Sequence, residues 1–472
     1  MNYKYFIALG GAAALLPACA PKQAAHYNVL FLMADDMKPA MACYGDTIAI
    51  TPALDGLAKD GILYSRAYCQ QAVSGPSRAS LLTGMYPDQT GVLSLNTWIR
   101  KKNPDIVTLP QAFREAGYVT ASAGKVFHGA KNNLDGLSWS LPPLFYEQIR
   151  SEAYILEEDK TDYKSVSNEF TTLDESLYYD VQIRQAALSR LDSLASGDKP
   201  FFFAVGFHKP HLPWCAPQRF LDMYLPRQLS IDTARVAGAP FQAYRSNREL
   251  IEYNDVPSDG PIPMEQQEYL KKCYYACSSF TDENIACILR RLKDLGLYDN
   301  TLIVFLGDHG YHHGEQGLWC KSTEFESSCN APLIIKLPKG MKDRKARALA
   351  DVPVSFVDIM PTLCEVCGVP APEHLSGENL LGGSHGPYAF SQIAHSHGGV
   401  KYTGYTVRDL RWTYTEWLTP GLECAAAELY DMDGRDSLRY EKQNVLSQYP
   451  EKASALSKAL HDHLDTVLGS GR

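Results

Sequence analysis

The sequence lacks an excess of basic residues and lacks a hydrophobic run long enough to cross a membrane. Its 472 residues include 45 Lys and Arg against 54 Asp and Glu, a formal net charge of −9. This balance excludes the broad cationic surface of a nucleic-acid-binding protein. The apolar run from Phe6 to Ala18 is too short for a stable transmembrane helix. The chain has no internal repeat and, apart from the alanines of this run, no low-complexity tract.

The cysteines also lack a pattern, because the 12 are scattered without the spacing of a small disulfide scaffold. Cys364-x-x-Cys367 has no second such pair and lies in an amphipathic helical pattern, so we interpret it as helix core. Cys273 and Cys277, four residues apart, receive the same interpretation. With 45% hydrophobic and 21% charged residues, the chain is globular, and its length suits two or three domains.

The first residues have the features of a secretory signal. Lys4 precedes the apolar run, which ends in Leu16-Pro17-Ala18-Cys19. This is similar to a bacterial lipoprotein signal, in which residues 1–18 are removed and Cys19 is lipidated; a plain signal peptide with a chance cysteine is the alternative. We therefore expect a periplasmic or cell-envelope lipoprotein, on the outer membrane of a Gram-negative bacterium and attached only through its lipid.

Strand and helix patterns alternate over most of the chain, which predicts an α/β sandwich with a large mixed central sheet flanked by helices. The predicted strands cover residues 27–33, 62–68, 119–123, 201–207 and 302–306, and helices begin at Pro52 and cover 265–295 and 358–366. A Gly/Pro/Ser-rich stretch at 369–387 precedes short runs at 402–407, 410–417 and 428–430 and a helix at 449–468. We expect a catalytic domain over 25–375 and a smaller antiparallel α+β domain over 376–472.

One short segment is specific enough to indicate a chemistry. It reads S-x-P-S-R-x4-T-G and fixes five positions: Ser74, Pro76, Arg78, Thr83 and Gly84. In sulfatases this pattern directs conversion of its first residue into a formylglycine aldehyde. Ser-Gly-Pro-Ser is also a common turn sequence before a helix. The motif alone therefore leaves open the alternative that Ser74 is an ordinary turn residue.

Acidic residues follow two predicted buried strands. Asp35 and Asp36 end the first strand, and Asp308 and His309 follow the strand at 302–306, at the strand ends where α/β sheets build ligand sites. Three carboxylates desolvated together repel one another unless a cation joins them. Oxygen ligands favour Ca²⁺ or Mg²⁺, although the nitrogen of His309 weakens that choice. The alternative is a pair of helix N-caps.

With these residues in view, the chain resembles the type I sulfatases of the alkaline-phosphatase superfamily, and among them the iduronate-2-sulfatases and bacterial uronate 2-O-sulfatases. The similar stretches are Met33–Met37, Gln71–Gly84, Gly124–His128, Gly206–His211, Asp308–Gly310 and Trp319–Lys321. They extend from Asn28 to about Asn444 and so cover almost the entire mature chain.

The resemblance implies an alkaline-phosphatase-like fold and a set of roles. Formylglycine at position 74, hydrated and bound to one Ca²⁺ together with Asp35, Asp36, Asp308 and His309, would attack sulfur. Arg78 would stabilise that nucleophile, and Lys125 and Lys321 would hold the sulfate oxygens. His208 would protonate the leaving sugar oxygen, and His128 would help to regenerate the aldehyde. The site would contain three negative carboxylates, one divalent cation and the positive charges of Arg78 and the two lysines. Their sum is a formal charge of +2, which suits an anionic substrate.

The resemblance also implies a substrate, the 2-O-sulfated uronic acid of heparin, heparan, chondroitin or dermatan sulfate oligosaccharides, taken from the chain end by a monomeric enzyme. Residues beside the motifs could contact the sugar: Trp98, Arg100, Trp214, Tyr311 and His312. The aromatic ones could equally be rim packing.

Two departures from the family pattern affect maturation. Serine at position 74, where cysteine occurs in other members, implies oxidation by an anaerobic sulfatase-maturating enzyme, and Met85 replaces a common arginine. Two other functions stay open. One is a phosphatase or phosphodiesterase of the same superfamily that uses Ser74 directly; the other is a non-catalytic sulfated-glycan binder.

Overall fold

The computed structural model describes residues 27–129, 134–144, 150–161, 165–245, 248–341, 350–382, 385–433 and 440–469. The predicted signal and Cys19 lie outside these ranges. Within them, no helix is both long and apolar enough to cross a membrane. The described cysteines form no disulfide, and the pairs 273/277 and 364/367 are buried in helices as expected.

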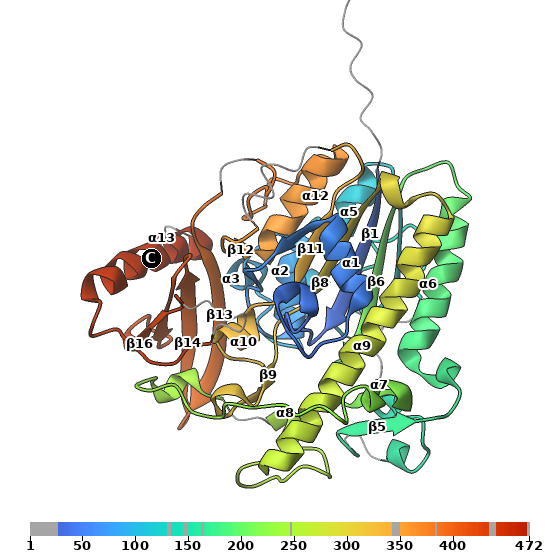
Figure 1. Cartoon of the computed structure of the whole chain (residues 1–472). Helices are drawn as coiled ribbons and strands as arrows, with labels where there is room; N and C mark the ends of the chain where they lie inside the picture. Colours follow the sequence, from blue (N-terminus) through green and yellow to red (C-terminus); the bar gives the residue numbers. More distant parts are fainter. Residues whose placement is uncertain are drawn as a thin grey trace, which may run out of the picture.

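A mixed sheet of six strands forms the centre of the molecule, as the sequence predicts (Figure 1). The strand order is β2-β11-β8-β1-β6-β4. The strands are β2 (Ile62–Tyr64), β11 (Leu333–Lys336), β8 (Thr301–Gly307), β1 (Asn28–Asp35), β6 (Phe201–Pro210) and β4 (Val119–Gly124). The last four named are parallel, and β11 runs antiparallel to both of its neighbours. The carboxyl ends of β8, β1, β6 and β4 therefore meet at one edge.

Helices cover both faces of this sheet, and alternate side chains of β1 show why. Val29, Phe31 and Met33 pack with helices α2 (Ser74–Thr83), α5 (Leu109–Glu115) and α12 (Ile359–Cys367). Leu30 and Leu32 pack on the opposite face with α1 (Pro52–Asp60), α6 (Tyr179–Ala195) and α9 (Met264–Asp294). An uninterrupted apolar strand is typical of a sheet that is buried on both faces, and the prediction made from residues 27–33 is confirmed.

The smaller sheet near the C-terminus is also present, drawn in red at one side of the molecule in Figure 1. Its antiparallel strands follow the order β13-β14-β15-β16, namely Ala389–His397, Val400–Arg408, Trp412–Leu418 and Cys424–Asp431. Helix α13 (Pro450–Leu468) packs against it through Leu456 and Leu460. The domain boundary at 375/376 stays a prediction.

Local details differ from the sequence-based expectations. The single strand expected at 62–68 is divided, because β3 (Ala67–Tyr68) leaves the main sheet and pairs with β12 (Val354–Ser355). Strands β11 and β13 were not predicted from the sequence. Because β11 has only four residues, its pattern is too short to separate from a buried loop.

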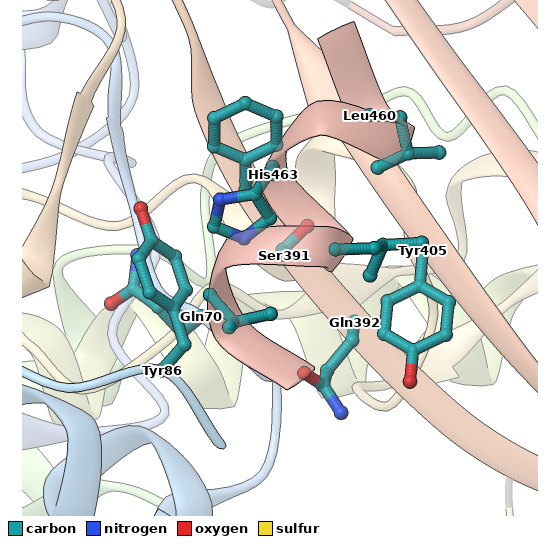
Figure 2. A pocket seen from close by; sticks show the side chains of 10 residues that line it. Gln70, Tyr86, Ser391, Gln392, Tyr405, Leu460 and His463 are labelled. Carbon is teal, nitrogen blue, oxygen red and sulfur yellow. The ribbon is translucent and has the colours of Figure 1, made fainter. Parts of the chain in front are cut away.

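A small cavity lies where α13 meets the catalytic part of the chain, and Figure 2 shows Tyr86, Gln392, Tyr405 and His463 around it. Its volume is about 10 Å³, room for a single water. The ring of His463 stacks on Phe390 with centroids 3.8 Å apart, and Tyr86 meets it edge-on. This cavity is a packing junction, too small to hold a sugar.

Candidate active site

Ser74 is the first residue of α2 and lies at the carboxyl edge of the central sheet. Its Oγ donates to Oδ1 of Asp35 at 3.0 Å and lies 3.1 Å from Nε2 of His309. Gly84 ends the same helix with a φ of 66°, and its N–H donates to the carbonyl of Ser80. The motif therefore encodes a short helix with a left-handed glycine cap, which presents its first residue to the acidic strand ends.

Arg78 lies four residues after Ser74, on the same face of α2, and is fully buried. Its Nε donates to Oδ2 of Asp308 at 2.9 Å, and Nη2 lies 3.4 Å from Oδ1 of Asp35. Nη1 donates to the carbonyls of Lys125 and Val126 at 2.5 and 3.0 Å. One guanidinium therefore joins the ends of β1, β4 and β8, a task that its planar set of donors suits.

The structure brings the four predicted metal ligands together. Asp35, Asp36, Asp308 and His309 are all buried, and each offers one ligand atom within 4.8 Å of the others. Nδ1 of His309 lies 2.9 Å from the carbonyl of Gly310, which places the proton on Nδ1 and leaves the Nε2 lone pair facing the carboxylates. Buried Oδ2 of Asp36 has no hydrogen-bond partner among the described residues. This donor set fits one divalent cation.

Two lysines neutralise the same carboxylates. Nζ of Lys125 donates to Oδ2 of Asp35 at 2.7 Å, and Nζ of Lys321 donates to Oδ1 of Asp36 at 2.6 Å. Burial on its own raises the pKa of Asp35, but Lys125, followed by His211 and the other cations, outweighs it and holds that pKa well below its ordinary value. Burial lowers the pKa of Lys321, yet the surrounding carboxylates raise it above its ordinary value. Lys321 is therefore cationic at neutral pH.

His208 and His211 lie on either side of a turn at the end of β6, and their surroundings differ. The ring of His208 packs against the ring of Tyr179, with centroids 5.3 Å apart. The backbone N–H of His208 donates to the carboxylate of Asp180. His211 instead directs Nε2 toward the centre, 3.8 Å from Oδ2 of Asp36. Asp180 also accepts the N–H of Lys209, and burial raises its pKa to about 6. His211 therefore contacts the acidic centre directly.

His128 follows β4 and is half-buried. A methyl group placed on Gly75 would lie 3.5 Å from its Cδ2, so the imidazole lies next to the residue that follows Ser74. The role that the family resemblance implies for His128 stays a prediction.

The five predicted sugar contacts are not brought together. Trp98 is exposed, whereas Arg100 binds Asp135 with Nε at 2.7 Å and Gln111 with Nη2 at 2.5 Å. Trp214 and Tyr311 are fully buried and pack edge to face. His312 is buried, with Nε2 2.9 Å from Oγ1 of Thr323, and burial lowers its pKa to about 3. In this structure, packing and internal pairing account for all of them except Trp98.

Two candidate functional residues were not predicted from the sequence. His211 belongs to a quoted motif but received no role, and Glu249 in α8 (Arg248–Ile251) belongs to none. Oε2 of Glu249 lies 3.2 Å from Nζ of Lys321, and Oε1 lies 3.3 Å from Nε2 of His211. No local pattern could have revealed this contact, because 72 residues separate Glu249 from Lys321. Including Glu249 lowers the formal charge around the site from +2 to +1.

A family model described as "Sulfatase" matches residues 27–369. The chain belongs to the sulfatase family. A second model, described as "N-sulphoglucosamine sulphohydrolase, C-terminal", matches residues 314–467 of this sulfatase. Iduronate 2-sulfatase of Homo sapiens is 30% identical to it over 472 residues, covering 83% of this chain and 85% of the human protein. The Mus musculus protein is also 30% identical, over 471 residues, with 83% and 84% covered.

Solved structures show that the sulfatase has an alkaline-phosphatase-like fold. A phosphonate monoester hydrolase from Silicibacter pomeroyi matches with a TM-score of 0.74 and 22% identity, covering 93% of this chain and 95% of the hydrolase. A structure titled as a 2-O GAG sulfatase matches with a TM-score of 0.67 and 20% identity, covering 94% and 92%. The fold prediction is confirmed, and the family membership makes the protein a sulfuric ester hydrolase.

Proposed function

We propose that this sulfatase removes the 2-O-sulfate of a terminal uronic acid in heparin, heparan, chondroitin or dermatan sulfate oligosaccharides, after conversion of Ser74 to formylglycine. The observation that carries the hydrolytic part is Ser74 at the tip of α2, in contact with Asp35 and His309. The similarity to the iduronate 2-sulfatases supports the sugar and the position.

Asp35, Asp36, Asp308 and His309 would hold the divalent cation, for which we propose Ca²⁺. A cation held there would lower the pKa of the hydrated aldehyde at position 74 and so make it a better nucleophile. Arg78 binds both Asp308 and Asp35 and so holds these two carboxylates in place beside position 74. Lys125 and Lys321 each already bind a carboxylate that faces the site. The same ammonium groups are placed to bind the sulfate oxygens, where they stabilise negative charge in the transition state.

The departing sugar oxygen needs a proton, for which the family resemblance implies His208, and we propose His211 as a second candidate donor. Nδ1 of His211 lies 2.5 Å from the carbonyl of Leu212, which requires a proton on Nδ1. Its Nε2 faces oxygens of both Asp36 and Glu249, which are two acceptors for an Nε2–H. An imidazole protonated on both nitrogens can donate Nε2–H to a leaving group. The proposed roles of Arg78, Lys125, Lys321 and His128 are unchanged.

The deciding experiment combines peptide mass spectrometry across position 74 with sulfate release, after co-expression with an anaerobic sulfatase-maturating enzyme. We expect formylglycine at 74 and free sulfate from an unsaturated 2-O-sulfated uronate disaccharide of heparin. The matched 6-O-sulfated glucosamine disaccharide should release none.

Each other outcome removes a part of the proposal. Serine alone at position 74, with activity undiminished, would sink the formylglycine mechanism. Sulfate release from the 6-O-sulfated disaccharide alone would overturn the 2-O assignment. Phosphate release with zinc and no sulfate release would identify the phosphatase, and binding of the disaccharide without hydrolysis would identify a glycan binder. The maturase, the lipid anchor, the envelope location and the monomeric state stay predictions.

A further inference from the structure

Glu249 places its carboxylate between Lys321 and His211, two side chains that border the site on the side of α8. Oε2 lies 3.2 Å from Nζ of Lys321, and Oε1 lies 3.3 Å from Nε2 of His211. The same two side chains also face Asp36, with Nζ of Lys321 at 2.6 Å from Oδ1 and Nε2 of His211 at 3.8 Å from Oδ2. Two carboxylates therefore share one lysine and one histidine.

Asp36 cannot keep these partners once a divalent cation binds. Its backbone has a φ of 61°, its N–H donates to Oδ1 of Asp308 at 3.1 Å, and its side chain is fully buried. These restraints hold the carboxylate next to the other metal ligands. A divalent cation at Asp36 would repel the ammonium of Lys321 at close range. Lys321 then needs another carboxylate, and Glu249 is already in contact with it.

We propose that Glu249 is a positioning residue for the metal-loaded site. Its negative charge draws Lys321 and His211 away from Asp36 when the cation binds, which lowers the cost of metal binding. It also leaves both groups facing the position of a sulfate ester. The first effect concerns metal affinity alone, and the second rests on the proposed function.

A second divalent cation is the competing explanation for this cluster. Asp36, His211 and Glu249 each offer one ligand atom within 4.8 Å of the others, and Oδ2 of Asp36 has no hydrogen-bond partner among the described residues. However, the ammonium of Lys321 already joins Asp36 to Glu249. A cation bound beside it would meet the same repulsion, so the structure favours the lysine as the resident positive charge.

Calcium titration by isothermal calorimetry tests the metal effect on the isolated chain with serine at position 74. We expect Glu249→Gln to bind Ca²⁺ about tenfold more weakly than the wild type, a moderate change because the carboxylate is partly hydrated. Glu252→Gln is the matched control, since Glu252 is an exposed carboxylate three residues further along the chain, and its affinity should be unchanged. Thermal melts in EDTA should be the same for all three proteins.

Glu249→Asp separates charge from shape, since it keeps the carboxylate, and we expect its Ca²⁺ affinity within about threefold of the wild type. Wild-type affinity in Glu249→Gln, or equal weakening in the Asp and Gln variants, would overturn the proposal. A stoichiometry of two Ca²⁺ per chain that falls to one in Glu249→Gln would establish the second metal site instead.

Kinetics with saturating Ca²⁺ test the second effect on the matured enzyme. In Glu249→Gln we expect KM for the sulfated disaccharide to rise by more than kcat falls, because Lys321 and His211 meet the bound sulfate before the reaction. An unchanged KM would overturn this half of the proposal. If the disaccharide is not a substrate at all, the proposed function fails, while the calcium titration still decides the metal effect.

Discussion

At the scale of single residues, Arg78 shows what the arginine of the S-x-P-S-R segment does in this fold. Its donors reach two carboxylates and two backbone carbonyls that belong to three strand ends. Lysine would offer one ammonium in place of this planar set. The residue therefore assembles the site in addition to neutralising it.

We expect Arg78→Lys to lower the free energy of unfolding by about 2 kcal/mol, because the carbonyls of Lys125 and Val126 lose their donors. Sulfatase activity should fall by about 100-fold or more, as in the loss of one oriented donor from a catalytic site. Urea denaturation and initial rates measure the two effects. Arg290→Lys, on an exposed face of α9, should change neither, and a fully active Arg78→Lys protein would contradict the interpretation.

The two histidines after β6 give a second test at this scale. If His211 is the proton donor, His211→Asn should lower kcat by about 100-fold or more on a sugar sulfate. The loss should shrink on 4-nitrophenyl sulfate, whose leaving group needs no proton. His208→Asn should show no such dependence on the leaving group. The reverse pattern would return the role to His208.

At the scale of elements, the close pairing of β4 with β6 positions Lys125. A Cβ on Gly206 would lie 1.8 Å from the carbonyl oxygen of Lys125, and one on Gly124 would lie 2.0 Å from that of Gly206. Gly124 also has a φ of 74°, which disfavours any other residue. The two glycines let the chain turn directly from β4 into the active site.

Gly206→Ala should therefore separate the ends of β4 and β6. We expect a loss of unfolding free energy of about 3 kcal/mol and weaker substrate binding through Lys125, measured by urea denaturation and by KM. Gly136→Ala is a suitable control, because a Cβ there meets nothing within 4 Å. Equal stability of the two variants would show that the strands can adjust.

Elements with a strong local pattern could be predicted, and long-range neighbours could not. The apolar run before Asp35 and the motif at Ser74 identified β1 and the reactive residue because their signals lie within a few adjacent positions. The predicted contacts of Trp214 and Tyr311 were based on sequence proximity, and both rings instead pack into the core. Glu249 reaches Lys321 only through the tertiary fold.

At the scale of the whole molecule, buried carboxylates occupy the junction between the catalytic part and the C-terminal sheet. Glu428 on β16 accepts from Nε1 of Trp417, and Glu441 accepts from the N–H of Glu326, the first residue of α10 (Glu326–Cys329). Burial, and then the neighbouring acids, raises the pKa of each from 4.5 to about 7. This junction therefore titrates near neutral pH.

These two groups should make the protein less stable as the pH rises. Between pH 4.5 and about 7 the folded state holds protons that the unfolded state has lost, so the free energy of unfolding falls with increasing pH. We expect a difference of about 2 kcal/mol for each group, and so about 4 to 5 kcal/mol for the two, between pH 5 and pH 8, seen as a lower Tm at pH 8. The double variant Glu428→Gln, Glu441→Gln should flatten this dependence, and an equally steep curve would locate its source elsewhere.

The burial of Ser74 also limits when the protein can be matured. Its side chain is enclosed by α2, the end of β1 and His309, and only 3% of the residue is accessible. An enzyme that oxidises this serine needs access to its side chain, which the folded protein encloses. Under the proposed conversion, oxidation would therefore precede folding. A chain that folds first would keep serine at position 74.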